Sequence, residues 1–208
     1  MKDLGELKYF LGIEFSRSQE SIVMYQRKYA LELVSELGLA GGKPAATPLE
    51  FNHKLTSIEF DKEIPYANTT LDNELEEKGS YQRLVGRLLY LTMTRPDIAF
   101  VVQLLNQYIP APKLSHMEVA LRVVRYIKTA PGLGLFMPAK ACKELVAYCY
   151  SDLGACVETR RSVTGYAVKF GAACISWKSK KQGTESKSSV EAEFRSMAST
   201  VAKVVWVT

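Results

Sequence analysis

The hydrophobic period of this chain changes once, near Gly134, and no other feature of the sequence constrains the fold as strongly. From Tyr81 to about residue 130 the apolar residues recur near the 3.6-residue spacing of a helix. After Gly134 they alternate with a period near 2, which is typical of half-buried strands. The sequence therefore predicts an α+β fold in which helices precede a sheet.

Three helices are predicted between residues 81 and 130. The first covers YQRLVGRLLYLTM, and the second opens at Thr94, where Asp97 three residues later completes a capping-box pattern. Ser115 and Glu118 repeat this start signal for the third helix, SHMEVALRVVRYIK. Connections this short favour a small helical bundle.

The first 79 residues are predicted to form a β-hairpin, a helix and a connection. KYFLGIEF (8–15) and SIVMY (21–25) are short apolar runs joined by the polar SRSQE. The helix covers YQRKYALELVSELG and stops at Gly38. Residues 56–79 are acidic and have no clear period, so we expect a mobile connection there.

Three strands and one helix are predicted after Gly134. The strands are ELVAYCYS, TGYAVKFG and ACISWKS, and a tight Gly-Ala connection joins the last two. Ser188 and Glu191 form a capping box that opens the final helix. The stripe of this helix that we expect to be buried comprises Val190, Phe194, Met197, Val201 and Val204.

The composition is that of an intracellular globular chain, although it leaves the compartment open. With 208 residues, of which 47% are hydrophobic, one or two domains with a real core are expected. No run approaches the roughly 18 apolar residues of a membrane span, and MKDLGELKYF lacks the layout of a signal peptide. The four cysteines form no CxxC pair and the two histidines lie far apart, which argues against zinc and favours free thiols.

The charge is distributed unevenly along the chain. Residues 1–79 hold 9 Lys and Arg against 14 Asp and Glu, whereas residues 80–139 hold 7 against 2 and residues 140–208 hold 11 against 6. A basic surface over the second and third segments would suit a polyanion such as nucleic acid. The alternative is an ordinary solvated surface.

The carboxylates near the end of the chain allow two interpretations. Asp152 ends a predicted strand, and Glu191 and Glu193 lie in the first turns of the final helix. Two-metal phosphodiester hydrolysis uses carboxylates that converge from different elements around Mg²⁺ ions about 4 Å apart. Spacing alone equally favours Asp152 as a turn former and Glu191 as a cap partner, and periodicity does not choose between the two glutamates.

Several stretches together resemble the Pol polyprotein of Ty1/copia-type LTR retrotransposons, and their sequences are most similar to those of plant elements. They are MKDLGELKYFLGIEF, YQRKYALELV, TPL, YQRLVGRLLYLTMTRPDIAF, RVVRYIK, TRRSVTGYAVKFG, ISWKSKKQ and SSVEAEFRSMA. They follow the order and spacing of the family over nearly the whole chain.

The resemblance implies four segments. Residues 1–55 would be the end of the reverse transcriptase palm with a primer-grip-like hairpin and helix, and residues 56–79 an acidic linker. Residues 80–138 would be the helical thumb or connection, which grips the template-primer duplex. Residues 139–208 would be an incomplete RNase H-like β-β-β-α unit.

The resemblance also assigns site residues. It makes Asp152 the first RNase H carboxylate and selects Glu193 over Glu191 as its partner, because EFRSMA matches the family pattern; the two would share a Mg²⁺ site. Basic residues of the helical part and of WKSKKQ would contact an RNA/DNA hybrid or template-primer duplex. These residues are Arg83, Arg87, Arg122, Arg125, Lys178, Lys180 and Lys181.

The chain departs from the family in ways that leave enzymatic activity open. It does not contain the polymerase Asp-Asp hairpin or the third RNase H aspartate, and DLGAC stands where the family usually has the longer DADWAGC. We therefore expect a Pol fragment that is inactive alone and holds Mg²⁺ weakly at most. The alternatives are a non-catalytic nucleic-acid-binding module and an interaction partner of full-length Pol; no membrane or small-molecule substrate is indicated.

Overall fold

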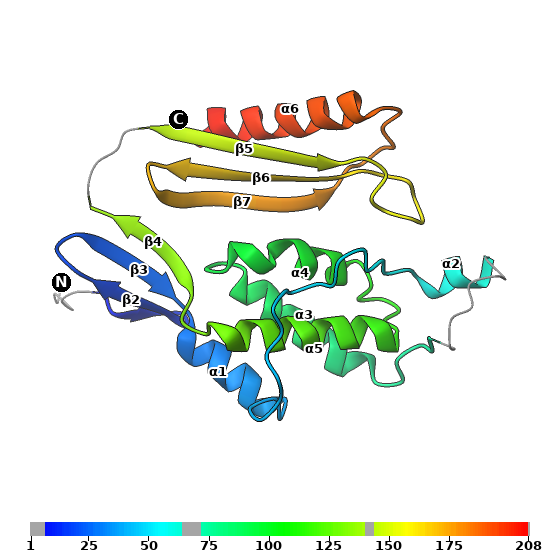
Figure 1. Ribbon diagram of the computed structural model, residues 1–208, viewed down its shortest axis with the longest axis horizontal. Helices are drawn as coiled ribbons and strands as arrows, with labels where there is room; N and C mark the ends of the chain where they lie inside the picture. The colour runs from blue at the N-terminus through cyan, green and yellow to red at the C-terminus, as the bar shows by residue number, and fades with distance from the viewer. Residues whose placement is uncertain (1–6, 64–71, 140–143, 208) are drawn as a thin grey trace, which may run out of the picture.

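The computed structural model describes residues 7–63, 72–139 and 144–207, and the chain forms a mixed α and β fold with antiparallel sheets. Figure 1 shows helix α6 above the sheet β5–β7, the other large helices below this sheet, and strands β1–β4 at one end. The predicted α+β class is confirmed at this level.

The first sheet has the strand order β1-β2-β3-β4. Strands β1 (Tyr9–Phe10), β2 (Ile13–Arg17) and β3 (Ser21–Tyr25) come from the predicted hairpin region. The prediction of one strand over residues 8–15 is wrong, because Leu11 and Gly12 have φ values of 48° and 76° and reverse the chain between β1 and β2.

Strand β4 (Gly134–Pro138) completes this sheet and was missed by the sequence patterns. It pairs antiparallel with β3, so that the chain returns to its N-terminal hairpin after the helices. A Cβ atom on Gly134 would lie 2.1 Å from the Met24 carbonyl oxygen, which explains why glycine starts the strand.

Helices build the main core. They are α1 (Arg27–Glu36), α2 (Ile58–Glu63), α3 (Lys78–Leu91), the 3-10 helix η1 (Pro96–Ile98), α4 (Ala99–Asn106) and α5 (Leu114–Thr129). Fully buried side chains from α1, α3, α4 and α5 form one cluster, as the helical periodicity predicted. In the described part of the chain, no helix combines the length and apolar character needed to cross a bilayer.

Two of the predicted helix starts differ from the structure. Thr94 does not cap a helix; its hydroxyl donates to Gln26 Oε1 at 2.8 Å, and Asp97 accepts from the Arg95 guanidinium instead. Helix α5 begins one residue before Ser115, with Lys113 as N-cap. These polar side chains form hydrogen bonds other than the predicted capping bonds, and a local sequence pattern does not reveal which partner a side chain will bind.

The described part of the acidic connection contacts the helices, and its expected mobility stays a prediction. The Lys113 ammonium contacts Asp61 at 2.5 Å and Asp72 at 3.0 Å, and its side chain is 3% exposed. The buried His116 imidazole lies 3.1 Å from the Thr56 carbonyl oxygen. Residues 64–71 of the predicted linker lie outside the described residues.

The second sheet follows the predicted pattern closely. Strands β5 (Leu145–Asp152), β6 (Val163–Phe170) and β7 (Ala173–Lys181) are antiparallel in the order β5-β6-β7. Gly171 has a φ of 57° in the predicted Gly-Ala turn between β6 and β7. Strand β5 forms the outer edge of this sheet, beneath α6 (Figure 1).

Helix α6 (Ser189–Val207) packs on the sheet with a face that was not predicted. Its buried residues are Ala192, Ser196 and Thr200, a row of small side chains that lets the helix approach β5 and β6 closely. The stripe expected to be buried is instead solvent-facing at four positions: Val190, Phe194, Met197 and Val201 are 40–63% exposed. The predicted capping by Ser188 is confirmed, because the Glu191 amide donates to Ser188 Oγ, but the Glu191 side chain accepts from the Lys187 amide and so does not complete the capping box.

Candidate carboxylate site and basic surfaces

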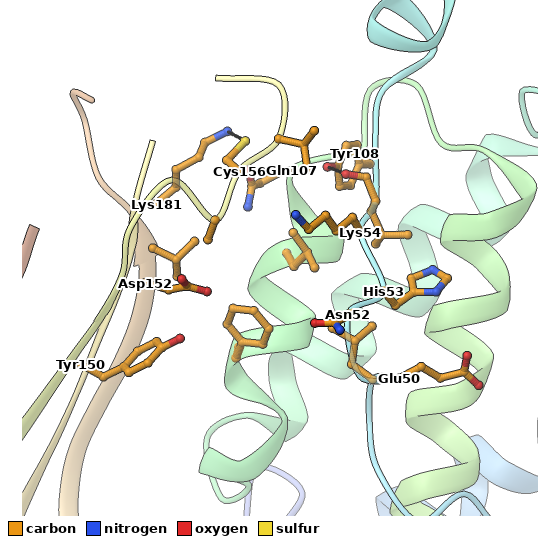
Figure 2. A pocket seen from close by; sticks show the side chains of 17 residues that line it. Glu50, Asn52, His53, Lys54, Gln107, Tyr108, Tyr150, Asp152, Cys156 and Lys181 are labelled. Atoms are coloured by element: carbon orange, nitrogen blue, oxygen red, sulfur yellow. Dashed lines mark hydrogen bonds between the residues drawn. The ribbon is translucent and has the colours of Figure 1, made fainter. Parts of the chain in front are cut away.

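Asp152 is the last residue of β5, and its side chain enters a cavity between the second sheet and the helices. The cavity has a volume of about 300 Å³ and is lined on the sheet side by Tyr150, Asp152 and Val163. Figure 2 shows the Asp152 carboxylate and the Tyr150 hydroxyl pointing into this space. Burial raises the pKa of Tyr150, and the adjacent Asp152 carboxylate adds to this effect.

Helix α6 covers the opposite face of the same sheet. Ser196 Oγ donates to the Tyr150 carbonyl oxygen at 2.8 Å and lies 2.5 Å from Thr164 Oγ1. Thr164 is the register partner of Ser151, so both side chains face α6. Because successive strand residues point to opposite faces, Asp152 points away from α6.

The two candidate glutamates have different surroundings on α6. Glu191 accepts from the Lys187 amide at 2.8 Å and pairs with Arg195 at 2.6 Å. The Lys187 amide, together with Arg195, holds the pKa of Glu191 below its usual value. Glu193 is exposed to solvent. Glu191 therefore stabilises the start of the helix, and Glu193 remains the carboxylate available for other roles.

A Mg²⁺ ion shared by Asp152 and Glu193 stays a prediction, and the two residues come from elements on opposite faces of the sheet. The Asp152 carboxylate enters the cavity on one face of the sheet, whereas Glu193 belongs to the helix on the other face. Over residues 7–63, 72–139 and 144–207, no group of three or more His, Cys, Asp or Glu side chains is placed to hold a metal ion. Two-metal hydrolysis requires carboxylates that converge on one point.

The cavity also holds a thiol and an ammonium group that the sequence patterns did not bring together. Lys181 Nζ lies 3.7 Å from Cys156 Sγ, as the dashed line in Figure 2 marks. Burial alone would raise the pKa of Cys156, but hydrogen bonds from Thr159 and the Lys181 charge outweigh it, and this pKa is lowered. No sequence spacing signals this pair, because the contact joins β7 to the loop after β5.

The predicted nucleic-acid-binding arginines of the helical part have unequal surroundings. Arg87 forms an ion pair with Glu36 and lies over the Tyr29 ring, and Arg122 forms an ion pair with Glu50 at 2.6 Å. Arg83 is exposed on α3. Arg125 on α5 is half-buried and lines a small cavity together with Arg122 and Glu50. Their nucleic-acid role stays a prediction.

The predicted basic residues of β7 are also divided. Lys178 and Lys180 are exposed, and their register partners Tyr166 and Thr164 place them on the α6 face of the sheet. Lys181 is the register partner of Val163, and both residues line the Asp152 cavity. The three lysines therefore do not form one surface, and two of them are open to a polyanion.

Comparisons with known proteins complete this description. No protein-family model matches the chain, and no solved structure matches it. An uncharacterized mitochondrial protein of Arabidopsis thaliana, AtMg00810, is 36% identical over 99% of the chain, which spans 80% of that relative.

Retrotransposon proteins match over the whole chain as well. The Retrovirus-related Pol polyprotein from transposon RE1 of Arabidopsis thaliana is 36% identical, and that from transposon TNT 1-94 of Nicotiana tabacum is 31% identical. The chain spans 13% and 15% of these two polyproteins. The full-length matches confirm the expected relationship: the chain belongs to the Pol polyprotein family of copia-type retrotransposons and corresponds to a fragment of such a polyprotein.

Proposed function

We propose that this chain is a non-catalytic segment of a copia-type Pol polyprotein. Its parent would carry out RNA-directed DNA synthesis and Mg²⁺-dependent hydrolysis of RNA/DNA hybrids. Residues 7–139 would correspond to the end of the palm and the thumb or connection, and β5–β7 with α6 to part of an RNase H unit. The order of elements and the relatives named above support this assignment.

The observation that carries the proposal is the position of Asp152 relative to α6. Its carboxylate enters the cavity on the helical side, while Ser196 and Ala192 hold α6 on the other side of the sheet. Glu193 belongs to the helix on that other side and is exposed to solvent there. The loop that follows β5 holds one further carboxylate, Glu158, which accepts a hydrogen bond from the Ser57 amide.

A cleavage assay tests this proposal. Purified chain is incubated with a labelled RNA/DNA hybrid and Mg²⁺, alongside the Asp152→Asn and Glu193→Gln variants. We expect all three to release no more product than buffer alone. Mg²⁺-dependent cleavage by the unaltered chain that disappears in Asp152→Asn would contradict the proposal.

Binding to nucleic acid is the second candidate function, and the exposure of Lys178 and Lys180 favours it. Contacts to phosphates release counterions, so the affinity should fall steeply with salt. If both lysines contact phosphates, the Lys178→Gln/Lys180→Gln variant lowers the slope of log K against log salt by about 1.8. Fluorescence anisotropy with a hybrid duplex over a salt series measures this slope.

Lys28→Gln/Lys43→Gln is the matched control for the binding measurement. It removes the same two charges from exposed positions outside the predicted contact residues, so we expect an unchanged slope. Absence of binding at low salt, or equal slopes for all variants, would contradict a role for the β7 lysines.

A further inference from the structure

The cavity between the second sheet and the helices contains a thiol and an amine that the proposed function does not use. Cys156 belongs to the loop after β5, Lys181 is the last residue of β7, and both line this cavity. Lys181 Nζ lies 3.7 Å from Cys156 Sγ, and Figure 2 shows the two side chains directed toward each other. Both residues are half-buried, which partly shields their charges from solvent. We call these two residues the Cys156–Lys181 pair.

Backbone hydrogen bonds hold both members of the pair in place. The buried Ser162 ends the loop after β5, and its carbonyl oxygen accepts from the Gln182 amide at 2.8 Å. The Cys156 amide donates to the carbonyl oxygen of the preceding residue, Arg161, at 3.1 Å. Two adjacent carbonyl groups therefore fix Cys156 and the neighbour of Lys181. Because the backbone itself sets this geometry, the thiol and the amine stay close together in the folded chain.

The surroundings of Cys156 favour its thiolate form. Burial alone would raise the pKa of Cys156, but hydrogen bonds from Thr159 and the Lys181 charge lower it below the usual value of a thiol. The thiolate is the form of cysteine that attacks an oxidant. In the described part of the chain, no carboxylate lies within 4 Å of the Lys181 ammonium, so no ion pair competes with the thiolate for it.

We propose that hydrogen peroxide converts the Cys156–Lys181 pair into a sulfenamide, a covalent S–N bond between the two side chains. The cavity volume of about 300 Å³ far exceeds the roughly 10–15 Å³ that one water molecule requires. Peroxide is little larger than water and therefore fits beside the sulfur. The inference is independent of the proposed function, because it requires neither hydrolysis of a hybrid nor binding of nucleic acid.

The bond forms in two steps. In the first, the Cys156 thiolate attacks one peroxide oxygen and the O–O bond breaks. The sulfur becomes a sulfenic acid, and the departing hydroxide takes a proton from the Lys181 ammonium and leaves as water. In the second, the lone pair of the now neutral amine attacks the sulfur, the S–O bond breaks, and the hydroxyl leaves with one amine proton as water. Peroxide is thus reduced to two water molecules, and the pair loses two hydrogen atoms.

Proximity selects this pair over the other described cysteines. The contact makes the second step effectively unimolecular. Cys174 is the register partner of Lys169, but burial raises the pKa of Cys174, so that less thiolate is present. Cys149 is exposed and, within the described ranges, donates no hydrogen bond to a lysine side chain and accepts none from one. We therefore expect the S–N bond at Cys156 and not at Cys149 or Cys174.

Peptide mapping by mass spectrometry tests the proposal on the full chain. After treatment with excess hydrogen peroxide, we expect two peptides joined between Cys156 and Lys181. Their mass should lie about 2 Da below the sum of the two reduced peptides. Excess dithiothreitol should restore both side chains, because thiols cleave the S–N bond.

Lys181→Arg is the variant that isolates the second step. It keeps the positive charge beside Cys156 but removes the primary amine. We expect oxidation to stop at the sulfenic acid, which dimedone traps, and the yield of joined peptides to fall at least about 10-fold. Lys180→Arg is the matched control, because Lys180 is exposed on the α6 face of the sheet; its yield should equal that of the unaltered chain.

Four results would overturn the proposal. The first is an unaltered chain in which Cys156 retains oxygen and forms no bond to Lys181. The second is a bond between Cys174 and Lys169 of equal yield. The third is a loss of two hydrogen atoms at Cys156 that persists in Lys181→Arg, and the fourth is loss of the joined peptides in Lys180→Arg.

Discussion

His116 is the buried side chain that connects stability most directly to pH. Its Nδ1 accepts from the Lys113 amide at 3.0 Å, and its ring stacks on Tyr108 at a centroid distance of 4.1 Å. Burial lowers the pKa of His116 to about 4, and the nearby Lys113 charge acts in the same direction. The imidazole is therefore neutral in the folded chain at pH 7, with Nε2–H donating to Thr56.

We predict that the free energy of unfolding falls as the pH is lowered from about 6.5 towards 4. In this window the unfolded chain binds a proton at His116 and the folded chain does not, so acid favours unfolding by up to roughly 3 kcal/mol. Urea denaturation at a series of pH values measures this change. His116→Gln should flatten the profile, whereas His53→Gln, at an exposed position, should not; equal profiles would contradict this account.

At the level of single residues, sequence patterns predicted the backbone conformation of glycines better than the hydrogen-bond partners of polar side chains. Gly38 and Gly171 were assigned correctly because positive φ values depend on the residue itself. Thr94 and Ser115 were misassigned because their partners, Gln26 and Asp72, are distant in the chain. A hydroxyl that caps a helix and a hydroxyl that binds across the core have the same local sequence.

Strand β4 is the element that ties the N-terminal hairpin to the chain after the helices. Its five residues all pair with β3, and Gly134 lies opposite Tyr25. Periodicity did not detect this strand because a five-residue segment offers too few repeats and follows a helix closely. Its partner, β3, is more than a hundred residues away in the sequence.

We predict that Gly134→Ala destabilises the chain by about 2–3 kcal/mol, because the new Cβ atom would collide with the backbone of Met24. Gly86→Ala is the matched control within α3. Outside the neighbouring backbone of α3, no described atom lies within 4 Å of its added Cβ, so helix propensity should stabilise the chain by up to about 1 kcal/mol. Chemical denaturation of both variants measures the difference, and equal effects would show that the contact at Gly134 is not close.

In helix α6 the apolar stripe of the sequence and the face that packs on the sheet are different. Its length, start and capping residue were predicted, but its buried face was not. An apolar stripe indicates the face that favours burial, and the small-residue row at Ala192, Ser196 and Thr200 is the face that fits against β5 and β6. The stripe then remains on the surface, where Val190, Phe194, Met197 and Val201 are exposed.

On the scale of the whole molecule, the cavity between the second sheet and the helices determines what the Asp152 carboxylate meets. The two parts are joined by contacts that no local pattern predicts, such as Trp177 Nε1 donating to the Thr92 carbonyl oxygen at 3.1 Å. The resemblance to copia-type Pol identified the family from sequence alone. The orientation of Asp152 relative to Glu193 depends on strand register and on the face covered by α6, and only the structure gives these.

Manganese titration tests the central claim most directly, since Mn²⁺ replaces Mg²⁺ at carboxylate sites and its binding is measured by paramagnetic resonance. The claim is that Asp152 and Glu193 lie on opposite sides of the sheet and share no ion. We predict that, at millimolar Mn²⁺, the unaltered chain, Asp152→Asn and Glu193→Gln bind the ion equally weakly. One saturable Mn²⁺ site that is lost in both variants would contradict the account.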